Sequence, residues 1–233
     1  MTRIGIITDV HADVHALRDA LFQIERRLHC EMVICCGDVI DYGLFPLETI
    51  ALLRSAGVVT IRGNHDRWAI SEGRDVSGWD LTPSTVTFLE GLRPSLSLVV
   101  DGVAIAVHHA RPGDDMNGIY PGSGPQADGD TAYLLEQAAV TVPDLATEIA
   151  GTARTKRRAA DVLIVGHTHT PMYRACEHGV IINPGALLRS PAADGAFPPK
   201  TGGTFGVLVP GAGLFTVYRA SDGSVVSKHR RTA

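Results

Sequence analysis

The sequence predicts a layered α/β fold, in which strands alternate with helices along the chain. Short apolar runs at residues 4–7, 32–36 and 58–61 are separated by segments with a helical hydrophobic period. This alternation is typical of a sheet covered by helices. The length of 233 residues suits one domain, since α/β folds of roughly 200–250 residues are often undivided. We therefore expect a single domain over residues 1–233.

The first two strands are each followed by a predicted helix. Asp13 is placed to cap a helix in which apolar residues between positions 17 and 28 recur at steps of four, three and four. This spacing gives one apolar stripe along the helix. Pro46 suits the first turn of a second helix, because the missing N–H and fixed φ of proline are tolerated there.

Further elements are expected after residue 83. A short helix is predicted over residues 84–92, and Asp101-Gly102 between two apolar runs is a strong hairpin signal. Residues 112–130 are rich in Gly, Pro and Asp and predict a long loop that acts as a specificity loop or lid. A helix broken at Pro143 is expected over residues 131–158. The remaining strands are predicted at residues 162–165, 180–182, 205–209, 214–218 and 224–228.

Composition and charge disfavour several function classes. The chain has 21 Lys and Arg against 25 Asp and Glu, a formal net charge of −4, so a nucleic-acid partner is not favoured. No apolar run approaches the roughly 18 residues of a membrane span, and the first residues resemble a strand rather than a signal peptide. We therefore expect a cytoplasmic protein without membrane contact. The four cysteines are expected to be buried free thiols.

Metal-capable side chains directly follow five of the predicted strands. In open α/β sheets the carboxyl ends of the strands form one edge where ligands bind, so we expect these side chains in one cleft. Asp-x-His, Gly-Asp and Gly-Asn-His-Asp are each common as turns or caps, whereas Gly-His-x-His is moderately specific for a metal site. Together the stretches bring carboxylate, amide and imidazole groups to that cleft. The stretches are Asp9-Val10-His11, Gly37-Asp38, Gly63-Asn64-His65-Asp66, His108-His109 and Gly166-His167-Thr168-His169.

Taken in order, these stretches resemble the signature of the calcineurin-like metallophosphoesterases. That signature is Asp-x-His, Gly-Asp, Gly-Asn-His-Asp/Glu, a histidine at a strand end, and Gly-His-x-His. Residues 165–171, followed by Asn183-Pro184-Gly185, are similar to the small bacterial phosphodiesterase branch. The resemblance runs from residue 4 to about residue 188. It implies a four-layer α/β/β/α sandwich of two mixed β-sheets flanked by helices, with a two-metal centre.

The resemblance also implies ligands for two divalent transition metal ions. Carboxylate, amide oxygen and imidazole suit Mn, Fe, Co, Ni or Zn better than the all-oxygen sites of Mg or Ca, and Mn is the first choice. The expected ligands are Asp9, His11 and His169 for one ion, Asn64, His108 and His167 for the other, and Asp38 as the bridge.

One departure from the signature leaves a ligand open. The fourth stretch is His108-His109 where the family usually has His-Gly, so either histidine is able to face the metal. We favour His108, which directly follows the strand, and leave His109 as a structural residue or a substrate-facing donor. Arg67 and Arg111 are further candidates for substrate contact, because arginine suits phosphate.

His65 is expected to be the general acid rather than a ligand. The neighbouring Asp66 is placed to fix the tautomer of His65 and to raise its basicity. The chain is thus predicted to hydrolyse a phosphodiester or phosphomonoester by in-line attack of a metal-bound hydroxide.

The expected partner is a small phosphoester or nucleotide substrate. The first alternative is a protein Ser/Thr or Tyr phosphatase, and the less favoured one is a non-catalytic scaffold of the same fold. A homo-oligomer, paired through residues 205–209 or the final strand, is left open.

Overall fold

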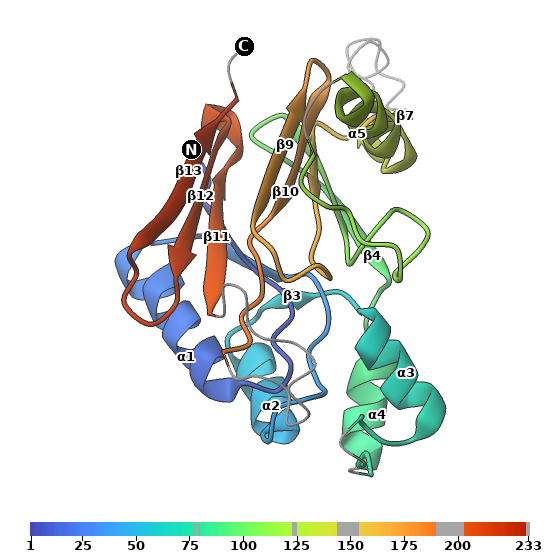
Figure 1. Ribbon diagram of the computed structural model, residues 1–233, viewed down its shortest axis with the longest axis vertical. Coiled ribbons are helices and arrows are strands. Elements are labelled where there is room, and N and C mark those ends of the chain that lie inside the picture. The colour runs from blue at the N-terminus through green and yellow to red at the C-terminus, as the bar shows by residue number, and fades with distance from the viewer. Residues whose placement is uncertain (77, 79, 123–124, 144–153, 190–202, 232–233) are drawn as a thin grey trace.

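The chain folds into two mixed β-sheets that pack face to face and are flanked by helices (Figure 1). The computed structural model describes residues 1–76, 78, 80–122, 125–143, 154–189 and 203–231. The first sheet has six strands in the order β13-β12-β11-β1-β2-β3. Their bounds are Ile4–Ile7 (β1), Met32–Cys35 (β2), Val59–Thr60 (β3), Thr204–Val209 (β11), Leu214–Arg219 (β12) and Val225–Arg230 (β13).

The second sheet has five strands in the order β4-β5-β8-β10-β9. Within it β5, β8 and β10 run parallel, whereas the outer strands β4 and β9 are antiparallel to their neighbours. In the first sheet β1, β2 and β3 are the parallel strands. The bounds in the second sheet are Ser95–Val100 (β4), Val103–His108 (β5), Val162–Ile164 (β8), Met172–Cys176 (β9) and Gly179–Asn183 (β10).

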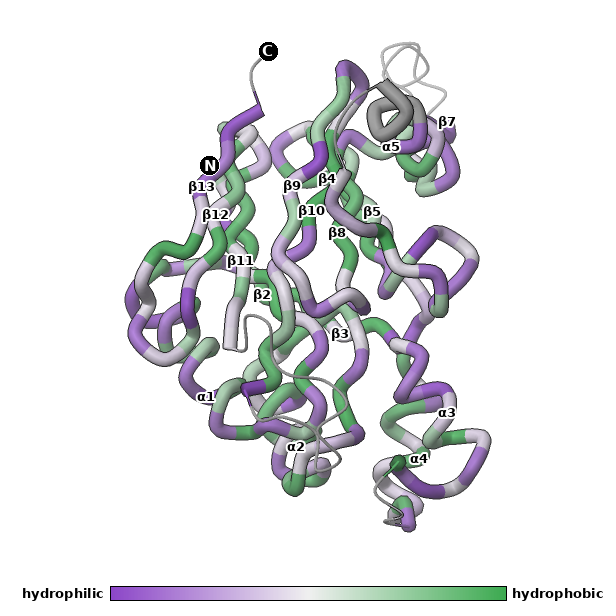
Figure 2. The backbone as a smooth tube through the Cα atoms, in the orientation of Figure 1, coloured by the Kyte–Doolittle hydropathy of each residue, from purple (hydrophilic) through white to green (hydrophobic). Residues whose placement is uncertain are grey.

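Fully buried apolar side chains fill the space between the sheets. Ile6 and Ile34 from the first sheet meet Ile105 and Ile164 from the second. In Figure 2 the green of hydrophobic residues runs along β5, β8 and β10. Burying each such side chain contributes about 1.5–3 kcal/mol, so this interface holds the two sheets together.

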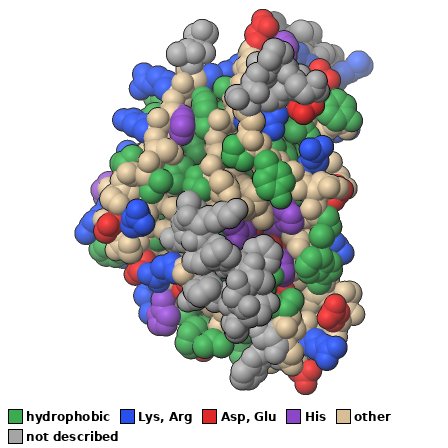
Figure 3. Space-filling model, in the orientation of Figure 1, with side chains coloured by type: hydrophobic (Ala, Val, Ile, Leu, Met, Phe, Trp, Pro, Cys, Tyr) green, Lys and Arg blue, Asp and Glu red, His purple; other side chains and the backbone are tan. Residues whose placement is uncertain are grey.

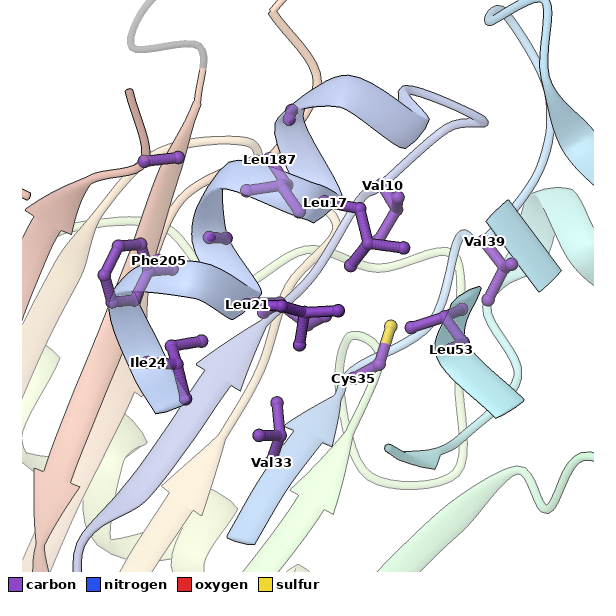
Figure 4. Close-up of a cluster of buried hydrophobic side chains, with 14 of the residues drawn as sticks. Val10, Leu17, Leu21, Ile24, Val33, Cys35, Val39, Leu53, Leu187 and Phe205 are labelled. Atoms are coloured by element: carbon purple, nitrogen blue, oxygen red, sulfur yellow. The ribbon is translucent and has the colours of Figure 1, made fainter. Parts of the chain in front are cut away.

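Helices cover the outer face of each sheet and complete the four layers. On the first sheet, α1 (Val14–Phe22), α2 (Pro46–Ser55) and a π-helical turn (Gln23–Arg27) pack through an apolar cluster. Figure 4 shows Leu17, Leu21 and Ile24 of this layer directed at the strands. On the second sheet, α5 (Pro125–Gln137) buries Leu134 and Leu135 against β10 and its neighbours. The predicted sandwich of two mixed sheets flanked by helices is confirmed.

Two helices near the first sheet differ in how well they were predicted. The helix expected over residues 84–92 is α4 (Pro83–Glu90), capped by the Thr82 hydroxyl. The helix α3 (Asn64–Glu72) was not predicted. It begins inside the Gly-Asn-His-Asp stretch, where Asp66 accepts a hydrogen bond of 2.9 Å from the Gly63 N–H and so caps the first turn.

The predicted helix over residues 131–158 is wrong beyond residue 137. Val140–Pro143 (β6) and Thr155–Arg158 (β7) form a separate antiparallel pair instead. Val140 and Val142 are buried while Thr141 is exposed, which is the two-residue period of a strand, and β-branched residues favour strands. Residues 144–153 of the prediction lie outside the described part of the chain.

The loop expected over residues 112–130 is shorter than predicted, because α5 begins at Pro125; residues 123–124 lie outside the described part. The strand β9 was not predicted either. The four cysteines are free, and Cys35 and Cys36 are buried, whereas Cys30 and Cys176 are partly exposed. Among the described residues, no helix is both long and apolar enough to cross a membrane.

Candidate metal centre

The carboxyl ends of the central strands bring the five metal-capable stretches together between the two sheets. Two groups result, and within each the nearest ligand atoms all lie within 4.8 Å of one another. In each group the aspartate comes from the first sheet and the Gly-His-x-His histidine from the second. Figure 3 shows histidine side chains gathered near the middle of the face it presents. The groups are Asp9, His11 and His169, and Asp38, His109 and His167.

Asp38 lies between the two groups. Its Oδ2 is 3.2 Å from His109 Nε2 in its own group and 3.8 Å from His11 Nε2 in the other. Asn64 adds an amide oxygen to the second group, with Oδ1 at 2.9 Å from His109 Nε2 and 3.0 Å from His167 Nδ1. One carboxylate is thus placed to contact ions in both groups, as a two-metal centre requires.

Backbone carbonyls fix the tautomers of two of these histidines. His11 Nδ1 is 3.1 Å from the carbonyl of Ile40, and His109 Nδ1 is 2.8 Å from that of Cys36. Because a carbonyl only accepts, each Nδ1 carries the proton, and in the neutral ring Nε2 is left with a free lone pair. That lone pair is directed at the metal-capable group, which is the usual arrangement of a metal-binding histidine.

The buried charges in the site fit bound cations. Asp9 and Asp38 are 0% and 1% exposed, and a buried carboxylate is costly unless positive charge or hydrogen bonds compensate it. Burial lowers the pKa of His11 to about 4, so this ring is neutral and able to act as a ligand. Burial also opposes a charge on His109, but the Asp38 carboxylate outweighs it and raises the pKa to about 10. A metal ion would replace that proton as the partner of Asp38.

Comparison with known proteins agrees with this geometry. The sequence model described as a calcineurin-like phosphoesterase superfamily domain matches residues 2–197. The chain belongs to this superfamily. An uncharacterised protein of Methanocaldococcus jannaschii is 22% identical over 196 residues, which cover 79% of this chain and 69% of that protein.

Solved structures of the superfamily share the fold. A metallophosphoesterase from Sphaerobacter thermophilus has a TM-score of 0.57 at 23% identity, over 90% of this chain and 84% of its own. Yfce, a phosphoesterase from E. coli, has a TM-score of 0.57 at 15% identity, over 98% of each chain. Vacuolar protein sorting 29 from Cryptosporidium parvum has a TM-score of 0.52 at 16% identity, over 99% of this chain and 98% of its own.

The prediction that His108 faces the metal is wrong. In this phosphoesterase fold His109, and not His108, lies among the other metal-capable residues. Alternate residues of β5 point to opposite faces of the sheet. Ile105 and Val107 face the core between the sheets, and His109 continues on that face to reach Asn64 and Asp38. His108 lies with Ala104 and Ala106 on the other face, and it is half-buried beside the metal-capable groups rather than among them.

The expected pairing of His65 with Asp66 is also wrong. Asp66 is fully buried and accepts backbone N–H groups of Gly63, Val39 and Ile40. Burial and the nearby Asp38 charge raise the pKa of Asp66 to about 7. The partner of His65 is Asp41, whose Oδ2 lies 2.7 Å from His65 Nδ1.

Asp41 and its neighbour Tyr42 are functional candidates that the sequence analysis missed. Burial lowers the pKa of His65, but the hydrogen bond to Asp41 and the Asp38 charge outweigh it, so the pKa lies above its ordinary value. The Tyr42 hydroxyl is 3.5 Å from His65 Nε2, and the rings of Tyr42 and Trp68 pack against that of His65. The imidazole of His65 is therefore oriented through Nδ1, and its Nε2 lies beside the Tyr42 hydroxyl, next to the two groups.

The backbone around the two metal-capable groups is held in an uncommon conformation. Residues other than glycine seldom adopt positive φ, and such strain gathers at functional sites. Asn183 helps to hold one of these turns, since its side-chain amide donates to the Gly166 carbonyl at 2.8 Å and to Thr168 Oγ1 at 3.2 Å. The metal-capable residues with positive φ are Asp9 (52°), His11 (47°), Asp38 (52°), His167 (67°) and His169 (54°).

Gly63→Ala should disrupt this site. A Cβ at Gly63 would collide with Asp38 Oδ1 and lie 2.5 Å from the Asp38 backbone nitrogen, and overpacking of this kind costs about 1–3 kcal/mol. We expect a lower free energy of unfolding in denaturant and less Mn bound after loading. The matched control is Gly91→Ala at the end of α4, where a Cβ meets nothing closer than 3.4 Å. Wild-type stability and Mn content in Gly63→Ala would contradict this account.

Proposed function

We propose that the chain is a dinuclear-metal-dependent phosphoesterase, which hydrolyses a phosphodiester or a phosphomonoester. The observation that carries this proposal is the pair of His/Asp groups with Asp38 between them and His65 beside them. Asp9, His11 and His169 would hold one divalent ion, and Asn64, His109 and His167 the other, with Asp38 shared. This donor set favours transition metals, Mn first, over Mg or Ca.

Two bound ions would supply Lewis-acid stabilisation of the phosphoryl group and an activated water. The protein's own groups orient these parts. Thr8 Oγ1 donates to Asp9 Oδ2 at 2.7 Å. The backbone N–H of His167 is shared between Oδ2 at 3.0 Å and Oδ1 at 3.2 Å, and Oδ1 also lies 3.3 Å from His169 Nε2. The backbone N–H of His65 donates to Asp38 Oδ1 at 3.0 Å. This leaves Asp38 Oδ2 directed at the two groups.

His65 is the proposed general acid. With Nδ1 hydrogen-bonded to Asp41, a protonated ring holds its second proton on Nε2, the atom that lies 3.5 Å from the Tyr42 hydroxyl. In an in-line displacement the leaving oxygen gains negative charge, and a proton from Nε2 neutralises it. Asp41 is then a positioning residue, which orients the ring and stabilises its positive charge.

A metal-by-substrate matrix tests this function. The purified protein is stripped of metal, loaded with Mn, Fe, Zn, Ni or Mg, and assayed with a generic monoester, a generic diester, a nucleotide set and a phosphopeptide panel. We expect hydrolysis of small esters with transition metals and little with Mg. Hydrolysis confined to phosphopeptides would favour a protein phosphatase. Absence of metal binding and of any hydrolysis would favour a non-catalytic scaffold of the same fold.

Asp41→Asn should lower kcat on esters with poor leaving groups by roughly 10²-fold, with little change in KM. The isosteric amide retains the shape of Asp41 but removes the charge that supports a protonated His65, and general-acid catalysis is worth about 10²–10⁴-fold. Rates for a series of aryl esters should depend more steeply on the pKa of the leaving group than in the wild type. A uniform loss across the series, or a loss of metal, would show a merely structural role for Asp41.

A further inference from the structure

A groove runs beside the second metal-capable group, between the start of α3, the start of β4 and the turn after β5. Its volume is about 660 Å³, which lies within the range of small-molecule sites. His109, the buried member of the second group, lines the groove together with the half-buried His108. The groove therefore opens directly onto the candidate metal centre.

Three arginines and two aspartates line this groove, and their pairing is unequal. Arg67 donates two hydrogen bonds of 2.8 Å to the carboxylate of Asp115, so these two charges compensate one another. The Asp114 carboxylate accepts the N–H of Met116 at 2.8 Å and the side-chain amide of Asn117. Asp114 is thus mainly engaged in holding its own turn, although its charge still attracts Arg111.

Arg62 and Arg111 are the cations that remain for a ligand. Within the part of the chain that the structure describes, neither guanidinium forms an ion pair with a carboxylate. Arg62 is partly exposed and Arg111 is exposed, and both line the groove. The backbone N–H of Arg62 donates to the Arg93 carbonyl at 2.8 Å, and the backbone N–H of Arg111 donates to the Asn117 carbonyl at 3.1 Å. Both side chains therefore extend from a backbone that is held in place.

The positions of these arginines relative to the metal-capable residues set the spacing that a ligand must have. Arg62 is two residues from Asn64, and Arg111 is two residues from His109. Two residues span at most about 7 Å of backbone, and an arginine side chain is long enough to reach back along that distance. A phosphate at the metal centre and a second anion at the arginines would thus be close enough to belong to one small molecule.

We infer that Arg62 and Arg111 form a second anion subsite, and that the substrates are phosphate esters carrying another anionic group near the reacting phosphorus. This inference rests on the proposed phosphoesterase function and narrows its substrate class. Guanidinium groups suit phosphate or carboxylate because they donate two parallel hydrogen bonds. The reacting phosphate lies at the metal-capable groups, and the second anion lies in the groove.

Binding of two phosphonates with the same three-carbon chain tests the subsite without turnover. Propane-1,3-diphosphonate carries two anions and propylphosphonate carries one, and neither can be hydrolysed. Their affinities for the Mn-loaded protein are measured by calorimetry at low and high salt. Arg62→Gln and Arg111→Gln remove one groove cation each, and Arg18→Gln on the exposed side of α1 is the matched control. Hydrolysis of bis(p-nitrophenyl) phosphate, which has no second anion, is measured in parallel.

The wild type and Arg18→Gln should bind the diphosphonate about tenfold more tightly than the monophosphonate. A tenfold gain in affinity is roughly what one charge-assisted hydrogen bond contributes. Each groove variant should lose most of that preference, whereas Arg18→Gln should keep both the preference and the wild-type turnover of the simple diester. Equal affinity for both probes in the wild type, or an unchanged preference in both variants, would overturn the subsite. Failure to hydrolyse any ester would instead reject the proposed function, while the binding preference would still report on the subsite.

Discussion

Asp38→Asn should leave the chain folded but deprive it of most of its metal and nearly all of its activity. Asp38 Oδ2 is the carboxylate oxygen that lies near both His11 and His109, so its charge is shared by the two candidate ion positions. The side-chain amide of the Asn variant keeps an oxygen that accepts a hydrogen bond from the backbone N–H of His65, so the local packing is preserved. We expect kcat/KM to fall by at least about 10²–10³-fold, the scale of losing one preorganised electrostatic contact, and bound Mn to fall below two equivalents.

Circular dichroism and metal analysis separate this result from misfolding. Asp130→Asn is the matched control, because Asp130 is an exposed residue of α5 on the outer face of the second sheet. It should retain both metal content and activity. An Asp38→Asn protein that binds two equivalents of Mn with wild-type affinity would refute the bridging position of this carboxylate.

His65→Ala is the second large effect that we expect. His65 belongs to neither metal-capable group, so the variant should bind the same amount of metal as the wild type. Its activity on an alkyl phosphodiester should fall by about 10²–10⁴-fold, because an alkoxide needs a proton as it leaves. The loss should be much smaller with p-nitrophenol as the leaving group, since its anion is stable without a proton.

A comparison of the two leaving groups with metal-loaded protein measures this effect. His178→Ala, at an exposed histidine, serves as the control and should behave as the wild type with both esters. If His65→Ala hydrolysed the alkyl ester at the wild-type rate with both metals bound, another group would have to donate the proton.

The sequence predicts the layered fold and the meeting of five strand ends because both depend on local patterns. Apolar runs mark the strands, and parallel strands place their carboxyl ends along one edge. The α3 helix was missed because its start lies in a stretch rich in polar residues, yet Gly63 followed three residues later by Asp66 is a capping signal. The β6 and β7 strands were missed because tertiary packing of Val140 and Val142 outweighs the helical pattern before them.

The two errors within the site have different physical causes. Adjacent histidines on a strand differ only in the face they occupy, and sequence alone does not say which face of β5 meets the other sheet. The inward position of Ile105 and Val107 decides in favour of His109. Asp41 is 24 residues from His65 in sequence, and only the packing of the β2 loop against α3 brings it closer to the ring than the neighbouring Asp66.

Each metal-capable group combines residues of both sheets, and this has a consequence for stability. The sheets otherwise meet through an apolar core, which resists separation without fixing one edge in place. Bound ions would cross-link the sandwich at its carboxyl edge, so that opening this edge and losing metal become one event. Ligands that bind only the folded state stabilise it by about 2.7 kcal/mol at a hundred times Kd. Chelation should therefore speed hydrogen exchange at the ends of β5 and β8 before the rest of the sandwich loosens.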